Sequence, residues 1–432
     1  MSSFRLALAA TMFALAGGAR SHADDWPQWG GPQRDLVWRE AGVAASFAAG
    51  ELPRVWSAPV GPGYSGPAVA DGRVFLTDRI AEEDVERVLC FDAHDGRQLW
   101  KRQYPAPYSI SYPLGPRATP TVDGDLVYVL GAVGHLLCLR AGSGDVVWQK
   151  HLPADYGTKL PIWGMAAAPL VDGDQLIVLV GGAGGALVVS FDKHTGQERW
   201  RALDDPAVGY APPVIYEFAG RRQLIIWHAS ALSALDPATG RVLWEFAWPI
   251  REALTIAMPR KVGNRLFVTA FYEGPRMIDL GTDGMSPKSV WNVPVGSDTS
   301  NRSIHSIMPT PIVTEELVFG ISSYGQLRCL ETATGEMVWE TRQPTGEGRW
   351  WNAFLVPHGE LSGRRVYLAN EQGELIVAQM SRDGYRELSR AKLIEPTQPI
   401  QRRMTVWSHP ALAMRSVFAR NDRELIRVSL EE

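Results

Sequence analysis

The sequence predicts an all-β protein, an eight-bladed β-propeller of four-stranded blades whose last blade is closed by N- and C-terminal strands. Three observations support this prediction. A tryptophan-containing motif repeats along the 432 residues, each repeat has room for four short strands, and the last repeat lacks one strand that the N-terminal region supplies. A period of about 40 to 50 residues with four strands and no long helix is typical of propeller blades.

The repeated motif is a turn glycine followed four residues later by a tryptophan. Its clear copies are residues 92–100, 140–148, 192–200, 236–244 and 331–339, and degenerate copies carry Gly284 with Trp291 and Gly384 with Leu388. Earlier in the period, pairs such as Asp71-Gly72 mark hairpins, because Asp-Gly supplies the positive φ angles that two-residue turns need. Apolar runs such as residues 126–130 follow and predict the inner strands of each blade.

Counting first strands gives the number of blades. They are expected to begin near Pro67, Pro120, Pro169, Pro213, Pro259, Pro311, Phe354 and Pro410. The last unit, residues 408–430, has room for only three strands, and residues 53–60 with Trp56 have the pattern of the missing fourth. Pairing the two ends of the chain would close the ring and remove exposed sheet edges.

The first 23 residues are predicted to be a secretory signal peptide. Arg5 precedes an apolar run over residues 6–17, and the small residues Ser21 and Ala23 fit a cleavage site after Ala23. The run is too short to span a bilayer, and no other segment has the pattern of a transmembrane helix. No cysteine lies near the cleavage site, so no lipoprotein anchor is expected, and the mature protein is expected in the periplasm or outside the cell.

The mature chain is expected to divide into two parts. Residues 24–52 form an N-terminal extension that packs on the propeller, and residues 53–432 form the propeller itself. Trp26, Trp29 and Trp38 of the extension are expected either to seal the outer surface of the propeller or to offer an aromatic patch to a partner.

Charge and cysteine content exclude several classes of function. Lys and Arg number 43 against 47 Asp and Glu, a net charge of -4, which argues against a nucleic-acid binder. Cys90, Cys138 and Cys329 each lie six residues before a repeat glycine. This is a position of small, inward-facing residues, so we interpret them as core packing rather than as a disulfide, redox or metal site.

The loops that enter the innermost strands converge on one mouth of the central channel, and their composition is unusually aromatic. An aromatic face together with arginines suits a planar anionic ligand or a peptide end, while the alternative is that these side chains only fill the channel. Arg117 is the strongest candidate for a ligand contact. The candidate residues are Tyr64, Arg117, Trp163, Tyr210, Arg260, His305, Trp350, Trp351, Asn352, Trp407 and His409.

No catalytic or metal site is predicted. The sequence contains no GxSxG, HExxH or P-loop motif, and His305 with His409 lacks a third ligand at a suitable spacing. The glycine-rich run at residues 181–185 is explained better by a hairpin turn than by phosphate binding.

The repeat at residues 232–244 and 189–200 resembles that of the pyrrolo-quinoline quinone (PQQ)-like propellers. This superfamily includes the quinoprotein alcohol dehydrogenases and the outer-membrane assembly lipoprotein BamB. The segments 25–32 and 63–69 resemble a secreted bacterial subgroup of these repeat proteins. The resemblance implies the propeller fold. The sequence departs from the dehydrogenases, which have two adjacent cysteines beside the quinone, and from BamB, which has an anchoring cysteine.

The resemblance and the departures together favour an exported non-catalytic propeller that acts as a protein-interaction or ligand-binding scaffold. Its partner would be another periplasmic or outer-membrane protein, or a small ligand, and not a nucleic acid. The chain is expected to be a monomer. The alternative is a PQQ-binding oxidoreductase of the quinoprotein type, with PQQ as its cofactor.

Overall fold

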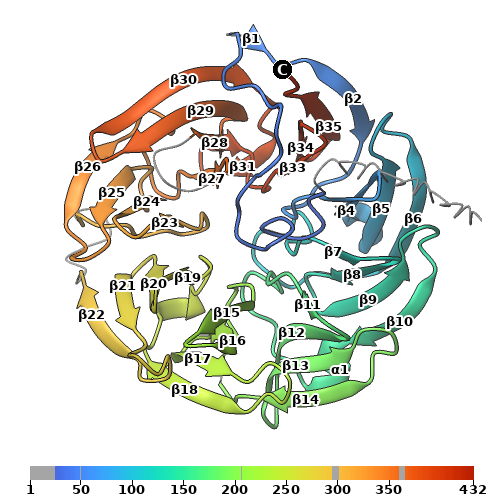
Figure 1. Cartoon of the computed structure of the whole chain (residues 1–432). Coiled ribbons are helices and arrows are strands. Elements are labelled where there is room, and N and C mark those ends of the chain that lie inside the picture. The colour runs from blue at the N-terminus through green and yellow to red at the C-terminus, as the bar shows by residue number, and fades with distance from the viewer. Residues whose placement is uncertain (1–24, 49, 206, 294–300, 360–364) are drawn as a thin grey trace, which may run out of the picture.

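Eight antiparallel sheets of four strands surround a central axis as the blades of a propeller (Figure 1). This computed structural model describes residues 25–48, 50–205, 207–293, 301–359 and 365–432, and the predicted signal peptide lies outside them. The eight-bladed architecture predicted from the repeat is therefore confirmed, and each innermost strand begins within about one residue of its predicted start.

The strands of each blade follow one another along the chain from the axis outward. Blade 1 consists of β3 (Ala68–Ala70), β4 (Arg73–Ile80), β5 (Val85–Asp92) and β6 (Gln98–Pro105), and blade 2 consists of β7 (Thr121–Asp123), β8 (Leu126–Leu130), β9 (His135–Arg140) and β10 (Val146–His151). Blade 3 consists of β11 (Leu170–Asp172), β12 (Gln175–Gly182), β13 (Ala186–Asp192) and β14 (Glu198–Ala202), and blade 4 consists of β15 (Val214–Phe218), β16 (Arg221–Trp227), β17 (Ala231–Leu235) and β18 (Val242–Ala247). Blade 5 consists of β19 (Arg260–Val262), β20 (Arg265–Ala270), β21 (Gly274–Asp279) and β22 (Lys288–Asn292). Blade 6 consists of β23 (Ile312–Val313), β24 (Leu317–Ile321), β25 (Leu327–Glu331) and β26 (Met337–Thr341). Blade 7 consists of β27 (Ala353–Pro357), β28 (Arg365–Asn370), β29 (Glu374–Ser381) and β30 (Gly384–Lys392).

Blade 8 is built from both ends of the chain, as predicted. It contains β33 (Ala411–Ala413), β34 (Ser416–Arg420) and β35 (Glu424–Ser429), and its outer strand is β2 (Arg54–Pro59). Strand β2 pairs antiparallel with β35, with Ser57 opposite Ile426. The chain ends therefore close the ring, and β2 covers the edge of β35 that would otherwise be exposed.

A few elements were not predicted. Strand β1 (Gly50–Glu51) pairs in parallel with β30 and gives blade 7 a fifth strand. The loops between blades hold the short helix α1 (Leu152–Tyr156), the 3-10 turns η1 (Ala81–Glu83) and η2 (Arg251–Ala253), and a hairpin of β31 (Gln398–Ile400) and β32 (Arg403–Thr405). Within the described residues, every helix is too short to cross a membrane.

The repeated tryptophan fastens most of the blades to the next one. The indole N–H of Trp100 donates to the carbonyl of Ala141 at 2.9 Å, and its ring lies on Gly144, where a Cβ would be only 2.6 Å away. Trp56 makes the same contact with Ala93 and Gly96 across the closure of the ring. These glycines have φ near +75° and face an indole ring, so both the backbone and the packing require glycine.

The three cysteines lie in three different blades and are fully buried. Cys90, Cys138 and Cys329 are each 0% exposed and unpaired. Burial raises the pKa of each thiol to about 12, so each is neutral at physiological pH. They pack as small apolar residues in the interblade core.

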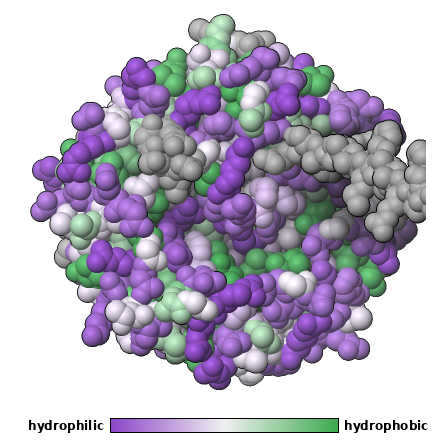
Figure 2. Space-filling view, viewed as in Figure 1, coloured by the Kyte–Doolittle hydropathy of each residue, from purple (hydrophilic) through white to green (hydrophobic). Residues whose placement is uncertain are grey.

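The two ends of the ring differ in construction. One end, here called the loop face, carries the loops between blades and the turns between second and third strands. The opposite end, the turn face, carries the tight turns between first and second and between third and fourth strands. Seen down the axis, the surface is mostly hydrophilic, with hydrophobic residues around the central hollow (Figure 2).

The segment before β1 runs inside the ring (Figure 1). Trp26 pairs with Val69 of β3, and Trp38 bonds to Pro357 at the end of β27. Trp26 and Trp38 are each 1% exposed and lie against innermost strands, so they do not cover the outer surface of the propeller. The sequence could not place them because this segment has no repeat.

Candidate functional site

The predicted candidate residues lie on the loop face, where several of them form aromatic pairs. The rings of Trp163 and Tyr210 are 5.7 Å apart, and Trp407 lies 5.9 Å from Tyr112, a residue that the sequence did not single out. His409 is 4.9 Å from Phe354 and 6.3 Å from Trp29, which reaches it from the N-terminal segment. The half-buried side chains here are termed the loop-face mouth: Tyr64, Tyr112, Arg117, Trp163, Arg349, Trp350, Trp351, Arg403 and Trp407.

Arginines stack on aromatic rings around this mouth. The guanidinium of Arg117 lies 5.2 Å from the ring of Tyr64, and that of Arg403 lies 5.0 Å from Trp351. Arg349 lies 5.0 Å from Trp350 and 5.4 Å from Phe271. A guanidinium stacked on an indole is held flat and keeps its edge for in-plane hydrogen bonds, a geometry that suits carboxylates.

Arg117 shapes its own loop. Its guanidinium donates to the backbone carbonyls of Ser111, Tyr112 and Gly115. Residues 111–117 are thereby folded around it, and Tyr112 is brought to the mouth opposite Trp407. The side chain lies where the sequence predicted, but most of its donors serve the loop.

Glu371, which was not predicted from the sequence, bonds to more than one side chain of the mouth. It is 1% exposed, and it accepts hydrogen bonds from Arg403 at 2.5 Å and from the indole of Trp407 at 3.0 Å. Asn352 donates to it at 3.3 Å. Burial raises the pKa of Glu371, and the bond from Arg403 acts in the opposite direction. The one signal in the sequence was its place in the turn after β28, on the same face as the interblade loops.

Other predicted residues lie deeper than the mouth. Arg260 is 7% exposed and donates to the carbonyl of Asp35 in the N-terminal segment at 2.9 Å. His305 is 0% exposed, with Nδ1 at 3.1 Å from the carbonyl of Phe271. Asn352 is also 0% exposed, and its Oδ1 has no hydrogen-bond partner within the described residues.

Buried carboxylates fix the loops that carry the mouth. Glu86 is 0% exposed and accepts from the hydroxyls of Tyr104 and Tyr108 and from the backbone N–H of Ala132 at 2.9 Å. This ties the start of the 106–117 loop to blade 2. Burial raises the pKa of Glu86.

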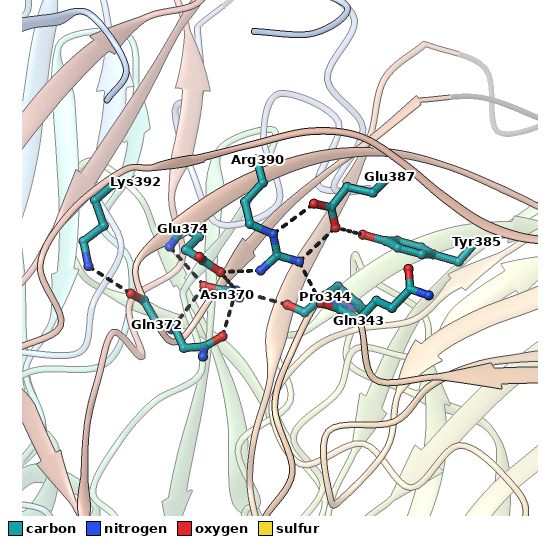
Figure 3. Close-up of polar contacts among 9 residues, drawn as sticks. All are labelled: Gln343, Pro344, Asn370, Gln372, Glu374, Tyr385, Glu387, Arg390 and Lys392. Atoms are coloured by element: carbon teal, nitrogen blue, oxygen red, sulfur yellow. Dashed lines mark hydrogen bonds and ion pairs between the residues drawn. The ribbon is translucent and has the colours of Figure 1, made fainter. Parts of the chain in front are cut away.

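A second network holds the loop of residues 342–352, which carries Trp350 and Trp351 (Figure 3). Arg390 donates to Glu374 at 2.6 Å, to Glu387 at 2.8 Å and to the carbonyl of Gln343 at 2.7 Å. Asn370 donates to the next carbonyl, that of Pro344, at 3.1 Å. The base of the loop is thus bonded to blade 7.

One group of residues has the order of a hydrolase triad. Asp205 Oδ2 lies 2.6 Å from His228 Nδ1, and His228 Nε2 lies 3.0 Å from the hydroxyl of Ser233. Ser233 is 0% exposed within β17, so its hydroxyl faces no space for a substrate. The chain of bonds joins blade 4 to its entering loop and is structural.

The residues present do not fit a calcium-bound quinone. Within the described ranges, no three His, Cys, Asp or Glu side chains lie together as a metal site. Both oxygens of Glu371, the carboxylate at the mouth, already accept hydrogen bonds. Since Cys90, Cys138 and Cys329 lie in different blades, they supply no disulfide beside a cofactor.

The fold and the loop-face mouth define a repeat propeller with aromatic and arginine side chains at one end of its channel. A sequence model of the family described as "Outer membrane protein assembly factor BamB" matches residues 36–160 and 86–341. The chain belongs to this family of PQQ-like β-propellers. No curated protein matches the sequence.

Solved structures share the fold at low sequence identity. BamB from Moraxella catarrhalis is 16% identical, with a TM-score of 0.58, over 88% of this chain and 98% of that one. Quinohemoprotein alcohol dehydrogenase from Comamonas testosteroni is 14% identical, with a TM-score of 0.65, over 94% of this chain and 80% of that one. A computationally designed protein, Ika8, is 12% identical with a TM-score of 0.55, over 87% and 99% of the two chains. These likenesses concern the fold alone.

Proposed function

We propose that this protein is an exported, non-catalytic scaffold that docks a protein partner at the loop-face mouth. The observation that supports the proposal most is the set of arginines stacked on aromatic rings there, with Arg403 on Trp351 and Arg349 on Trp350. Trp, Tyr and Arg are the residues that most often dominate the energy of protein interfaces. A partner that brings carboxylates and apolar side chains would meet both kinds of group.

Two features make the mouth suitable for docking. Its loops are fixed by the buried carboxylates Glu86 and Glu371, so little conformational freedom remains to be lost on binding. Two of the most exposed large apolar side chains, Ile162 at 51% and Met404 at 55%, belong to loops of the same face. The outer strands of the blades expose only scattered valines by comparison.

The rest of the proposal follows the sequence. Residues 1–23 would be removed as a signal peptide, and the mature monomer would work in the periplasm or outside the cell. The partner would be a periplasmic or outer-membrane protein. Residues 24–52 would act as an extension of the propeller rather than as a separate domain.

Site-directed photocrosslinking tests the docking surface. A photoreactive amino acid replaces Tyr112 at the mouth or, as the control, Val242 on the outer strand β18, where the side chain is 43% exposed. We expect a crosslinked adduct in intact cells only from position 112, and its loss when Trp351→Ala is added. The partner identified in the adduct is then purified. Its affinity should fall at least about tenfold with Trp351→Ala and stay unchanged with Val242→Ala. Equal crosslinking at both positions, or full affinity with Trp351→Ala, would overturn the docking surface.

A titration separates the scaffold from the oxidoreductase alternative. PQQ with Ca²⁺ is added to the purified protein while tryptophan fluorescence and dye-linked alcohol oxidation are followed. We expect neither saturable quenching nor turnover. Turnover that depends on both additions would overturn the non-catalytic proposal.

A further inference from the structure

The N-terminal segment lies in the channel and contacts most of the blades. Trp26 exchanges two backbone hydrogen bonds with Val69 of blade 1, at 2.8 and 2.9 Å, and the carbonyl of Pro27 accepts from Val122 of blade 2 at 2.8 Å. Farther along, Trp38 exchanges bonds with Pro357 and Gly359 of blade 7 at 2.9 and 2.8 Å. The segment therefore lies in the channel as a bound peptide would lie in a groove.

Arg34 is the central contact of this segment. Its guanidinium donates to the carbonyls of Ala168, Pro169 and Pro213 at 2.7, 3.1 and 2.9 Å, just before β11 and β15. The side chain is 4% exposed, and burial lowers its pKa to about 9. Among the described residues it has no ion pair, so the carbonyls of two blades and the amide of Gln28 satisfy it. These carbonyls form a receptor for a guanidinium.

The segment keeps its shape through bonds of its own. Leu36 N–H donates to the carbonyl of Gly30 at 2.8 Å, and Arg34 N–H donates to that of Gly31 at 3.0 Å. Gly31 has φ +81° and lies on the ring of Trp26, where a Cβ would be 2.9 Å away. Hydrogen bonds within residues 28–36 thus support the turn from which the side chain of Arg34 reaches the carbonyls before β11 and β15.

An exposed connector, residues 45–48, follows the segment of residues 25–44 and leads to the strands of the propeller. After Ala44, which bonds to Leu430 at 2.7 Å, the side chains of Ala45, Ser46 and Ala48 are exposed. A hollow of about 400 Å³ lies between residues 44–47 and the chain end at residues 429–432. The contacts of the segment with the ring are therefore made by residues 25–44 and not by the connector.

We propose that the part of the channel occupied by residues 25–44 is a peptide-binding groove whose ligand is a tryptophan- and arginine-bearing segment. Its occupant in this structure is residues 25–44 of the same chain, and a free peptide of that sequence can take the place. Recognition centres on Arg34 and its three carbonyls. The proposal does not rest on the docking proposed for the loop face, because its contacts are made by residues 25–44, which run from Val69 to the loop-face ends of β11 and β15 and back to Pro357.

The test cuts the connector of the complete protein. A protease site replaces residues 45–48, the purified protein is cut, and a fluorescent peptide of residues 25–44 is added in excess. We expect the cut segment to stay with the ring on size-exclusion chromatography and then to be exchanged for the labelled peptide. Since the covalent link supplies a high effective concentration, exchange should be visible only after cutting.

A matched pair of competitor peptides tests the recognition. Arg34→Ala leaves three buried carbonyls without a donor, so that peptide should compete at least about tenfold more weakly. Arg39→Ala removes the same charge from an exposed position, where Arg39 pairs only with Asp35 and the carbonyl of Val37, and should compete nearly as well as the native peptide. The proposal is overturned if the cut segment separates from the ring, if it cannot be exchanged, or if the two variant peptides compete equally.

Discussion

The two halves of the channel use the same residue types in opposite ways. In the filled half, the part of the channel that residues 25–44 occupy, Arg34 and Trp38 are 4% and 1% exposed, and backbone groups of several blades satisfy them. At the loop-face mouth, Arg403 and Trp351 stack on each other and remain half-buried. One half is filled by the chain itself, while the other presents its arginines and tryptophans to solvent.

The difference shows that the chemistry of a channel cannot be assigned from composition. A buried guanidinium is stable only where enough acceptors surround it, and the carbonyls before β11 and β15 meet that need for Arg34. Arg403 needs Glu371 for the same reason, but part of it reaches solvent. Under the proposed docking, the mouth is therefore the half whose side chains remain available to a partner.

The largest expected contrast is between two tryptophans. Trp38→Ala should destabilise the protein by about 4 kcal/mol, because a fully buried indole against Tyr367 and His358 is lost. Trp351→Ala should cost about 1 kcal/mol, because its ring is half-buried on the glycines of its own loop. Urea unfolding followed by circular dichroism measures both. Equal losses would show that the mouth is part of the core.

The next effect is acid sensitivity from the base of the mouth. Burial lowers the pKa of His305 to about 4, below the ordinary value of 6.5. The neutral imidazole therefore stabilises the fold fully above pH 6.5, and this contribution is lost as the pH falls from 6.5 toward 4. The loss should approach about 3 kcal/mol.

Replacing the imidazole isolates this contribution. His305→Gln should flatten the fall in unfolding free energy between pH 7 and 4.5, measured in urea at both values. His94→Gln, on an exposed turn, is the control and should leave the slope as it is. An unchanged slope in His305→Gln would mean that the acid sensitivity arises elsewhere.

The fold was predictable because it repeats. The turn glycine and the tryptophan recur because neighbouring blades repeat one contact, that of Trp100 with Gly144 and its equivalents. The spacing of the motif therefore gives the number of blades. The route of residues 25–44 could not be predicted, because its contacts with Val69, Pro213 and Pro357 occur once each and depend on the closed ring.

The mouth was predictable only in part. The loops entering the innermost strands gave Trp351 and Trp407, since topology brings those loops together. Glu371 and Arg403 lie 32 positions apart and meet only because a turn and a loop share a face. The direction of Arg117 toward its own carbonyls likewise depends on the fold of residues 111–117.

The smallest expected effect concerns Arg117, which shares properties with the arginines of both halves of the channel. It donates to three carbonyls, as Arg34 does, but all three belong to its own loop. Arg117→Ala should cost about 1 kcal/mol of unfolding free energy, because the freed carbonyls of Ser111 and Tyr112 can turn to water. The same change should weaken partner binding by about tenfold, since Tyr112 is no longer held opposite Trp407.

A matched substitution on the same face completes this test. Arg251 stacks on Tyr272 at 4.4 Å and is exposed, so Arg251→Ala should change the unfolding free energy by less than about 0.5 kcal/mol and leave binding intact. If Arg117→Ala instead cost several kcal/mol, Arg117 would belong with Arg34 to the core of the channel. If Arg117→Ala weakened partner binding without lowering the unfolding free energy, Arg117 would belong with Arg403 to the mouth, because only the order of a surface loop would have changed.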